Sequence, residues 1–256
     1  MAIAPLPHEP RAVRFATNRR RAEPARRVRD VLRGRIVGGE FDDGPLPYEQ
    51  ELSIKLGVTR NVVRDALDLL RREGLIERIP GAGTFVVARK STQGLDQLRG
   101  LAETFNGSGD WVVNQVIAAE IIDAPAFVAD RLGIDAGDPV VFIERLRHLR
   151  GQPLSLDASY LDASIAAAVL EEDLVANDVF VLLEQQLGLP LASADLSIEA
   201  VAADSSTAPL LGVVAGSPLL LLERLAILED GRPVDFEFVR YRGDRLSLTA
   251  QLIRHR

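Results

Sequence analysis

The 256-residue sequence contains no cysteine, only three histidines and no apolar run long enough to cross a bilayer. Without cysteine, disulfides, thiolate metal sites and thiol catalysis are excluded. His8, His148 and His255 lie far apart in sequence, which argues against a histidine metal centre or a catalytic triad. We therefore expect no metal, no cofactor and no enzymatic activity. Since the N-terminus lacks the apolar segment of a signal peptide, we expect a cytoplasmic protein with no membrane partner.

Lysine is nearly absent too, because Lys55 and Lys90 are the only two and arginine supplies the rest of the positive charge. That charge is unevenly distributed. Residues 1–90 contain 18 Lys+Arg and 12 Asp+Glu, a net charge of +6, whereas residues 91–256 contain 12 and 25, a net charge of −13. A basic first third predicts a polyanionic partner for that part only. Arginine suits bidentate contacts with phosphate and guanine.

Residues 1–22 contain three prolines and the run Arg19-Arg20-Arg21 without a helical or strand period, which predicts a flexible basic arm. The arm either contacts DNA phosphates or is a disordered start with solvated charges. A domain over residues 23–88 follows. Its first helix is expected to begin near Pro24 and to end at Gly38-Gly39, with an inner stripe of Ala25, Val28, Val31, Leu32 and Ile36.

A short helix over residues 48–56 is followed by the stretch GVTRNVVRDAL (57–67), whose polar groups are concentrated at the start of a third helix. Gly57 permits a sharp turn, and Thr59 can cap the third helix through its hydroxyl. The inner face of this helix is apolar (Val63, Ala66, Leu67, Leu70), and its opposite face carries Arg60, Asn61 and Arg64. This is the helix-turn-helix arrangement, in which the second helix enters the major groove with its N-terminal end first.

Two short alternating segments follow, residues 74–79 and 84–87, around the turn PGAG (80–83). They predict a two-stranded wing in which Gly81 and Gly83 allow the main chain to approach DNA closely. An alternative role for Arg64 is an ion pair with Asp68 one turn later, worth a few tenths of a kcal/mol.

The stretch LPYEQELSIKLGVTRNVVRDALDLLRREGLIERIPGAGTFV (46–86) resembles the winged helix-turn-helix of GntR-type bacterial transcription regulators. The resemblance implies DNA contacts by Arg60, Asn61 and Arg64, a phosphate-contacting cap at Thr59, and a wing tip at Gly83. Two residues depart from the family pattern. Tyr48 replaces the usual capping serine, and Gln50 replaces an arginine that contacts DNA in many members, so the operator is expected to differ there.

Beyond a linker predicted over residues 89–98, the chain contains an internal repeat. Residues 120–149 align with 199–228 at a constant offset of 79, and twelve of the thirty positions are identical. The centre of the match is LGIDAGDPVVFIERL (132–146) against LGVVAGSPLLLLERL (211–225). The pattern of each copy predicts, in order, a strand, a short helix, a long strand, a tight hairpin and a return strand. Two copies predict one antiparallel sheet with approximate two-fold symmetry, covered on one face by helices over 165–170 and 179–187.

This pattern resembles the effector-binding UTRA domain of the HutC branch of GntR-type regulators, on the stretches ERLRHLRGQPLSLDASYL (144–161) and DGRPVDFEFVRYRGDR (230–245). The resemblance implies a chorismate-lyase-like fold over residues 99–256, with a pocket between the repeats. It also implies that the chain is an α+β protein of two domains.

Divergence between the copies points to where an asymmetric ligand would bind. Arg147 aligns with Ala226, so the fold does not require its charge. Strand alternation puts Arg145 beside Arg147, and puts Glu237 on the same face as Asp235 and Tyr241. Family members bind sugar phosphates and similar metabolites, and the resemblance implies that the positions of Arg145, Arg147, Asp157, Asp235 and Tyr241 bind the ligand.

A purely structural role is the alternative for Arg145, for Tyr241 and for Trp111. Arg145 recurs as Arg224, which suggests a symmetric structural salt bridge with Glu144 or Glu223 as partners. Tyr241 is also compatible with a core aromatic that has a polar tip. Trp111, the single tryptophan, is expected to have a packing role.

The sequence therefore predicts a transcription regulator, more specifically a repressor, that binds double-stranded DNA as a homodimer at an inverted repeat. A small polar or anionic effector would release it. Two alternatives are a DNA-binding protein without an effector and a lyase-type enzyme in the C-terminal domain.

Overall fold

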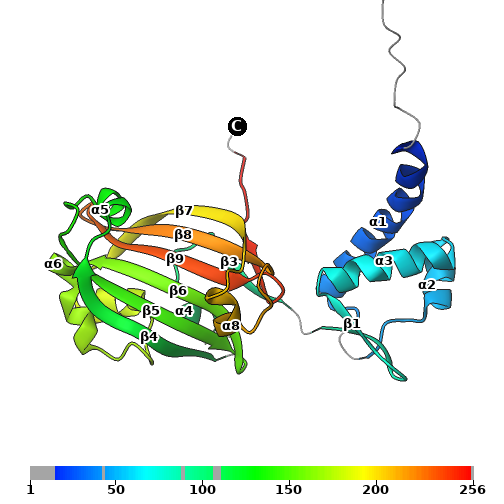
Figure 1. Cartoon of the computed structure of the whole chain (residues 1–256), viewed down its shortest axis with the longest axis horizontal. Coiled ribbons are helices and arrows are strands. Elements are labelled where there is room, and N and C mark those ends of the chain that lie inside the picture. The colour runs from blue at the N-terminus through cyan, green and yellow to red at the C-terminus, as the bar shows by residue number, and fades with distance from the viewer. Residues whose placement is uncertain (1–14, 42–43, 88–89, 106–110, 255–256) are drawn as a thin grey trace, which may run out of the picture. The chain divides into compact units, whose positions relative to one another are not determined.

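The chain forms two compact units, residues 1–89 and 90–256, in a computed structural model that describes residues 15–41, 44–87, 90–105 and 111–254 (Figure 1). Residues 1–14 of the expected arm lie outside the described residues. Within the part of the chain that is described, no helix is long and apolar enough to span a membrane.

The first unit consists of three helices and a hairpin: α1 (Phe15–Val37), α2 (Glu49–Leu56), α3 (Arg60–Arg72), β1 (Ile76–Ile79) and β2 (Gly83–Val86). The predicted inner stripe of α3 is buried and packs on apolar side chains from α1, α2 and β1, which confirms this part of the sequence pattern. The main members of this core are Val28, Leu32, Leu52, Val63, Ala66, Leu67, Leu70 and Ile76.

The first helix begins at Phe15, so the prediction of a flexible arm is wrong for residues 15–22. Pro24 lies inside α1, although an internal proline removes a backbone hydrogen bond and usually ends or kinks a helix. The surrounding arginines and alanines are good helix formers, and an ion pair of Arg27 with Glu23 spans the proline. Val31, expected on the inner stripe, is 51% exposed, whereas Ala25, Val28, Leu32 and Ile36 are buried as predicted.

The turn between α2 and α3 has the predicted geometry. Gly57 ends α2 in the left-handed conformation, with φ of 65°. The Thr59 hydroxyl accepts a hydrogen bond from the Val62 N–H at 3.4 Å, which confirms the cap of α3. Tyr48 precedes α2 without a side-chain cap, as its departure from the family pattern indicates. The Ser53 hydroxyl donates to the Val58 carbonyl at 2.6 Å and ties α2 to the turn.

The wing is confirmed as an antiparallel hairpin in which Ile79 pairs with Gly83. Gly81 lies in the turn at φ 79° with open space around it. Gly83, expected at the tip, is instead the first residue of β2. A Cβ at Gly83 would lie 3.2 Å from the Cβ of Pro45, so close packing on the segment before α2 favours glycine here.

A six-stranded antiparallel sheet forms the centre of the second unit, with strand order β4-β5-β6-β9-β8-β7. The strands are β4 (Val112–Asp123), β5 (Pro139–Leu149), β6 (Gln152–Asp162), β7 (Leu191–Ala202), β8 (Pro218–Leu228) and β9 (Pro233–Arg242). The order is symmetric about the contact between β6 and β9. Both bounds of β7 and β8 follow those of β4 and β5 at the offset of 79 found in the sequence, which confirms the predicted duplication.

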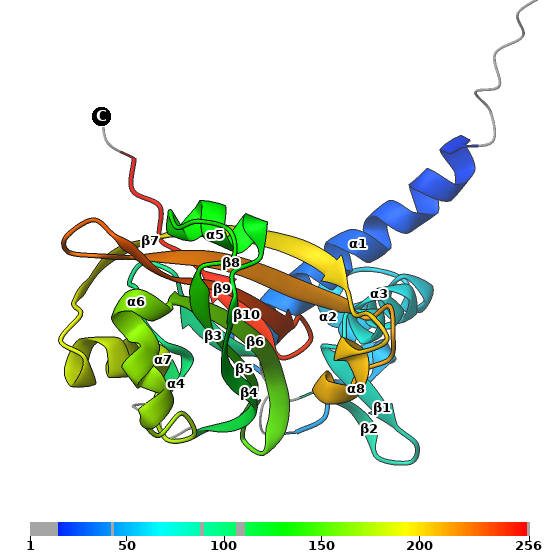
Figure 2. The ribbon, with the colours of Figure 1, turned by 60° about the vertical axis from the view of Figure 1, so that its left-hand side comes forward.

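Helices cover both faces of this sheet (Figure 2). The equivalent helices of the two repeats, α5 (Ala126–Leu132) and α8 (Thr207–Leu211), pack on one face. The opposite face is covered by the helices predicted between the repeats, α6 (Ala163–Ala166), η2 (Ala167–Glu171), α7 (Val179–Val181) and η3 (Leu182–Gln186). Further along that same face, α4 (Leu101–Phe105) packs on Leu149 and Tyr241. The α+β class is therefore confirmed.

The linker predicted over residues 89–98 is wrong in part, because β3 (Ser91–Gly94) pairs in parallel with β10 (Leu246–Thr249). The buried Gln93 side chain of β3 accepts a hydrogen bond from the Tyr241 hydroxyl at 3.2 Å. No local pattern shows β3, since its residues are polar or glycine and its partner strand lies near the end of the chain. Trp111 is 71% exposed, so the expected packing role is wrong.

A pair of glycine substitutions tests the helix-turn-helix geometry. Gly57→Ala forces a side chain into the left-handed conformation, so the first unit should lose about 1–2 kcal/mol of stability. Gly34→Ala is the matched control, because Gly34 lies inside α1 with nothing within 4 Å of the added Cβ. It should gain about 0.5–1 kcal/mol from helix propensity. Thermal unfolding followed by circular dichroism measures both, and equal effects of the two changes would contradict the assigned turn.

Candidate nucleic-acid interface and effector site

The start of α3 exposes Arg60, Asn61 and Arg64 on the face opposite its buried stripe. The Arg64 guanidinium donates to the Asn61 amide oxygen at 3.0 Å, so the two side chains are oriented together. The alternative partner of Arg64, Asp68, pairs instead with Arg71. Guanidinium and amide groups supply the hydrogen-bond donors that base edges and phosphates accept. The helix therefore presents a donor-rich, exposed end.

Other residues of the predicted interface differ in their placement. Thr59 is exposed, but its hydroxyl is engaged in capping α3. Gln50 is exposed on the first turn of α2. In the wing, Gly81 lies in the exposed turn, whereas Gly83 is partly covered where it packs on Pro45.

The six predicted effector residues are all buried on one face of the sheet: Arg145, Arg147, Asp157, Asp235, Glu237 and Tyr241. Cross-strand pairing arranges them in rows across β5, β6, β9 and β8. One row contains Arg147, Ser155 and Tyr241, and the next contains Arg145 and Asp157. The following row contains Ser159, Glu237 and Arg224, and the last places Asp235 between Leu161 and Ala226.

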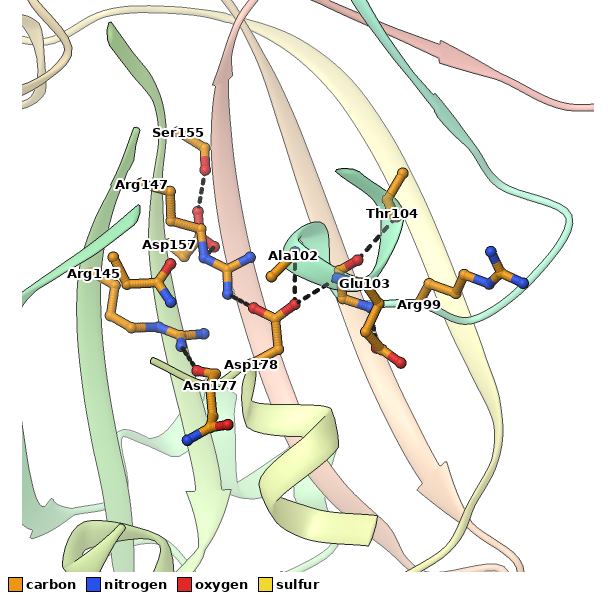
Figure 3. A network of polar contacts seen from close by, with 12 residues as sticks. Arg99, Ala102, Glu103, Thr104, Arg145, Arg147, Ser155, Asp157, Asn177 and Asp178 are labelled. Atoms are coloured by element: carbon orange, nitrogen blue, oxygen red, sulfur yellow. Dashed lines mark hydrogen bonds and ion pairs between the residues drawn. The ribbon is translucent and has the colours of Figure 1, made fainter. Parts of the chain in front are cut away.

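Arg147 is the most heavily paired of these residues (Figure 3). It forms ion pairs with Asp157, whose Oδ2 lies 3.0 Å from Nε, and with Asp178, which directly precedes α7. Burial opposes the guanidinium charge, but Asp178 and Asp157 outweigh this effect and raise the pKa of Arg147. Burial raises the pKa of Asp157 despite the opposing effect of Arg147. The Ser155 hydroxyl donates to Asp157 at 2.6 Å.

Asp178 connects α7 to the beginning of α4. Its Oδ2 accepts hydrogen bonds from the N–H groups of Ala102, at 2.7 Å, and Glu103, at 3.3 Å. Burial opposes its charge, but Arg147, Arg145 and the Ala102 N–H together lower the pKa of Asp178. Figure 3 shows its carboxylate between Arg147 and these two residues of α4.

Arg145 and Arg224 occupy equivalent strand positions but have different contacts. Arg145 donates to the Asn177 carbonyl at 3.1 Å, and burial, followed by repulsion from Arg147, lowers the pKa of Arg145 to about 10. Arg224 pairs with Glu237 and stacks over the Phe180 ring at 4.4 Å. The alternative of symmetric pairs with Glu144 or Glu223 is therefore wrong, because the partners come from a neighbouring strand and from the segment before α7.

Tyr241 combines both expected characters. Its ring packs in an apolar cluster with Leu101, Leu149 and Leu246, and its hydroxyl donates to Gln93. Burial, followed by the negative charge of Asp157, raises the pKa of Tyr241. The phenol is therefore a neutral hydrogen-bonding group at the border of the charged cluster.

Asp235 is buried, and neither carboxyl oxygen has a hydrogen-bond partner among the described residues. Its cross-strand neighbour is Ala226, the residue that takes the place of Arg147 in the second repeat. Burial and the neighbouring Glu237 raise the pKa of Asp235 well above its ordinary value. The buried acid thus has an alanine, and no arginine, as its cross-strand neighbour on β8.

Sequence analysis missed Asp178, Asn177 and Ser155. An acidic residue before an apolar helical pattern predicts a helix cap, yet Asp178 makes no side-chain cap on α7. The cavity among the clustered side chains has a volume of about 10 Å³, enough for about one water molecule. No group of acidic residues and histidines in the described ranges could hold a metal ion.

A wider hollow of about 580 Å³ lies on the other face of the sheet, beside α5. Aromatic rings line it, including Phe127, Tyr160, Phe236 and Phe238, which meet mostly edge to face. Arg131 stacks on Phe236 at 5.0 Å. The side chains of this hollow differ from the charged cluster because its charged members have no comparable network of buried ion pairs among the described contacts.

The raised pKa of Asp235 predicts a pH-dependent stability. In the folded state this carboxyl holds its proton above the unfolded pKa of about 4, so its contribution to stability is present at low pH and is lost as pH rises towards the folded pKa. As pH rises through that window, the stability of Asp235→Asn relative to the unchanged chain should therefore increase by about 1.4 kcal/mol per pH unit. Urea unfolding at pH 4 and pH 8 measures this difference, with exposed Asp195→Asn as control. A constant difference would contradict the assignment.

The comparisons with known proteins agree with this architecture. Residues 24–86 match the family described as "Bacterial regulatory proteins, gntR family", and residues 108–247 match the UTRA domain. The chain is 30% identical to the HTH-type transcriptional repressor NagR of Bacillus subtilis, over 86% of this chain and 90% of that protein. It is 27% identical to a probable fructoselysine utilization operon transcriptional repressor of Escherichia coli, over 89% and 94% of the two chains.

Among solved structures, PhnF from Mycobacterium smegmatis matches with a TM-score of 0.64 and 28% identity, over 88% of this chain and 99% of that chain. Both predicted resemblances are therefore confirmed, and so is the expectation that the chain is not an enzyme, since the family consists of regulators. The chain belongs to the GntR family of bacterial regulatory proteins and carries a UTRA domain.

Proposed function

We propose that this regulator is a repressor that binds an operator through α3 and is released when a small polar or anionic metabolite binds in the second unit. The observation that carries the proposal is the exposed start of α3, where Arg60, Asn61 and Arg64 stand above a buried apolar stripe. The relatives NagR and the fructoselysine protein are named as repressors, which supports the same direction of control.

On DNA, the first two turns of α3 lie in the major groove, and Gln50 and Gly81 approach the backbone at either side. Arg60 and Asn61 contact base edges, and Arg64, already bonded to Asn61, holds the amide in position. The protein binds as a homodimer at an inverted repeat, because one recognition helix reads too few base pairs for specificity in a genome.

The effector binds in the buried polar cluster formed by Arg145, Arg147, Asp157, Glu237 and Tyr241, with Asp235 at its edge. Two features favour this cluster over the aromatic hollow. Arg147 has no charged counterpart in the other repeat, where Ala226 takes its place, so the fold alone does not require its charge. Guanidiniums also bind oxyanions in a bidentate fashion, which suits a small polar metabolite.

Effector and operator must affect each other's affinity by the same factor if ligand binding controls release. A regulator without an effector, the second candidate, would show no such coupling. Equal affinity of the effector with and without operator DNA would favour that candidate.

Selection from genomic DNA tests the proposal. The purified chain is incubated with fragments of its own genome at moderate salt, and the retained fragments are sequenced. We expect an inverted repeat upstream of one operon, whose enzymes then nominate the effector. Retention without a common sequence would leave only charge-driven binding and would remove the base-reading role of Arg60 and Asn61.

Substitutions in α3 separate base reading from general attraction. Arg60→Ala should weaken binding to the selected operator by about 1–3 kcal/mol and relax its base preference. Arg64→Ala should weaken it as well, because the variant loses both a cation and the support of Asn61. Arg72→Ala, at the other end of α3, is the control for removing one exposed arginine. Fluorescence anisotropy measures the affinities, and unchanged binding in both variants would refute the docking of α3.

Replacing Arg147 tests the effector site. Arg147→Ala should bind the operator as the unchanged chain does, but the metabolite nominated by the operon should no longer release it. Arg131→Ala, in the aromatic hollow, should leave release unchanged. The reverse result would move the effector to the other face of the sheet.

A further inference from the structure

The carboxylate of Asp178 has the surroundings of a bound anion. Its side chain is 2% exposed, it forms an ion pair with Arg147, and it accepts hydrogen bonds from the N–H groups of Ala102 and Glu103. A guanidinium together with backbone N–H groups is a typical set of donors for a ligand carboxylate or phosphate. The Asp178 side chain makes no cap on α7, so its carboxylate is not held by its own helix.

The Arg147 guanidinium has donor capacity that its present partners do not use. Its Nε lies 3.0 Å from Asp157 but without the alignment of a hydrogen bond, so this buried N–H has no hydrogen-bond partner among the described residues. A buried donor left in this state destabilises the folded chain. A ligand with several oxygen acceptors would satisfy it better than the single carboxylate of Asp178.

Charge and space exclude simple addition of an anion. The guanidiniums of Arg145 and Arg147, which are buried, and of Arg224, which is partly buried, already face the carboxylates of Asp157, Asp178 and Glu237. The remaining cavity of about 10 Å³ is too small for a metabolite. An anionic group can therefore reach Arg147 only if a carboxylate leaves, and Asp178 is the one carried by a separate helical segment instead of the central strands.

We propose that Asp178 is a built-in occupant of the effector site, and that an oxyanion of the effector, carboxylate or phosphate, displaces it from Arg147 and from the N–H groups of Ala102 and Glu103. The inference rests on the effector site of the proposed function. The effector is thus an anion that replaces a protein carboxylate, and its apparent affinity is lowered by the cost of that exchange.

Displacement would also break a contact between two segments. Asp178 joins the start of α7 to residues 102–103 of α4. At Gly100 the backbone approaches so closely that an added Cβ would collide with the Asp178 carboxylate. Residues 100–105 follow the chain segment that enters the second unit from the DNA-binding unit. Release of Asp178 therefore frees α4, the first helix of the second unit.

Binding of simple anions to the full-length chain tests the proposal without knowledge of the effector. Asp178→Ser removes both the charge and the volume of the occupant, so it should bind inorganic phosphate or acetate about tenfold or more tightly than the unchanged chain. Isothermal titration calorimetry with each anion measures this gain, and the stronger of the two identifies phosphate or carboxylate as the recognised group. Asp178→Asn keeps the shape of the side chain, so its affinity for the anion should increase by less.

Two further variants control the experiment. Glu171→Gln removes an exposed negative charge a few residues away and should bind both anions as the unchanged chain does. Adding Arg147→Ala to Asp178→Ser should abolish the gain. The proposal is overturned if neither Asp178 variant gains affinity, or if the gain persists without Arg147. It is also overturned if both Asp178 variants fail to fold even with added phosphate, because a displaceable occupant is not required for folding.

These measurements involve no DNA, so their failure can be distinguished from a failure of the proposed function. If the Asp178 variants do not bind anions more tightly but Arg147→Ala still blocks release from the operator, the effector site is supported and the proposed role of Asp178 is refuted. If anion binding is gained but no effector response exists, the site is an anion site without a regulatory role.

Discussion

Arg147 is 4% exposed in the middle of a protein domain, and its charge must be compensated there. An isolated buried charge is very unfavourable, so a guanidinium in this place requires carboxylates within contact distance and further hydrogen bonds around them. This requirement brings together segments that are distant in sequence. Asp157 comes from the neighbouring strand β6, and Asp178 from the segment before α7. Asp178 in turn holds the backbone of α4. The charged cluster thus positions α4 and the start of α7, two of the helical segments that cover this face of the sheet.

The duplication explains where the cluster is symmetric and where it is not. The middle rows keep an arginine from each copy, Arg145 and Arg224, and an acid opposite or beside each of them, Asp157 and Glu237. The outer rows have diverged, with Arg147 and Ala226 at equivalent positions. A two-fold symmetric scaffold provides the strand positions, and the proposed effector site uses the asymmetry of the outer rows. The residues opposite them differ as well, because Ser155 lies opposite Arg147 and Asp235 lies opposite Ala226.

The two units obtain their specificity in different ways. In the DNA-binding unit, the side chains that we propose to contact DNA project from the exposed face of a helix whose opposite face is buried, so recognition and folding use different faces of α3. In the second unit, the side chains that we propose to bind the effector are themselves buried and contribute to the interior of the domain. Their substitution therefore affects ligand binding and stability together, whereas the exposed arginines of α3 can vary with little effect on stability.

The sequence by itself determined the elements whose information is local. The periodicity of α3, the cap at Thr59, the left-handed Gly57 and the offset of 79 between the repeats all follow from neighbouring residues or from direct self-comparison. It also identified six side chains that the sheet does bring to one face. Only the tertiary structure decided their partners. The pairing of Arg147 with Asp178, the strand β3 beside β10 and the packing of Gly83 on Pro45 join segments without any local pattern. Such contacts depend on which surfaces the folded chain brings within a few ångströms of each other. The partner of a buried charge is therefore decided by the tertiary structure.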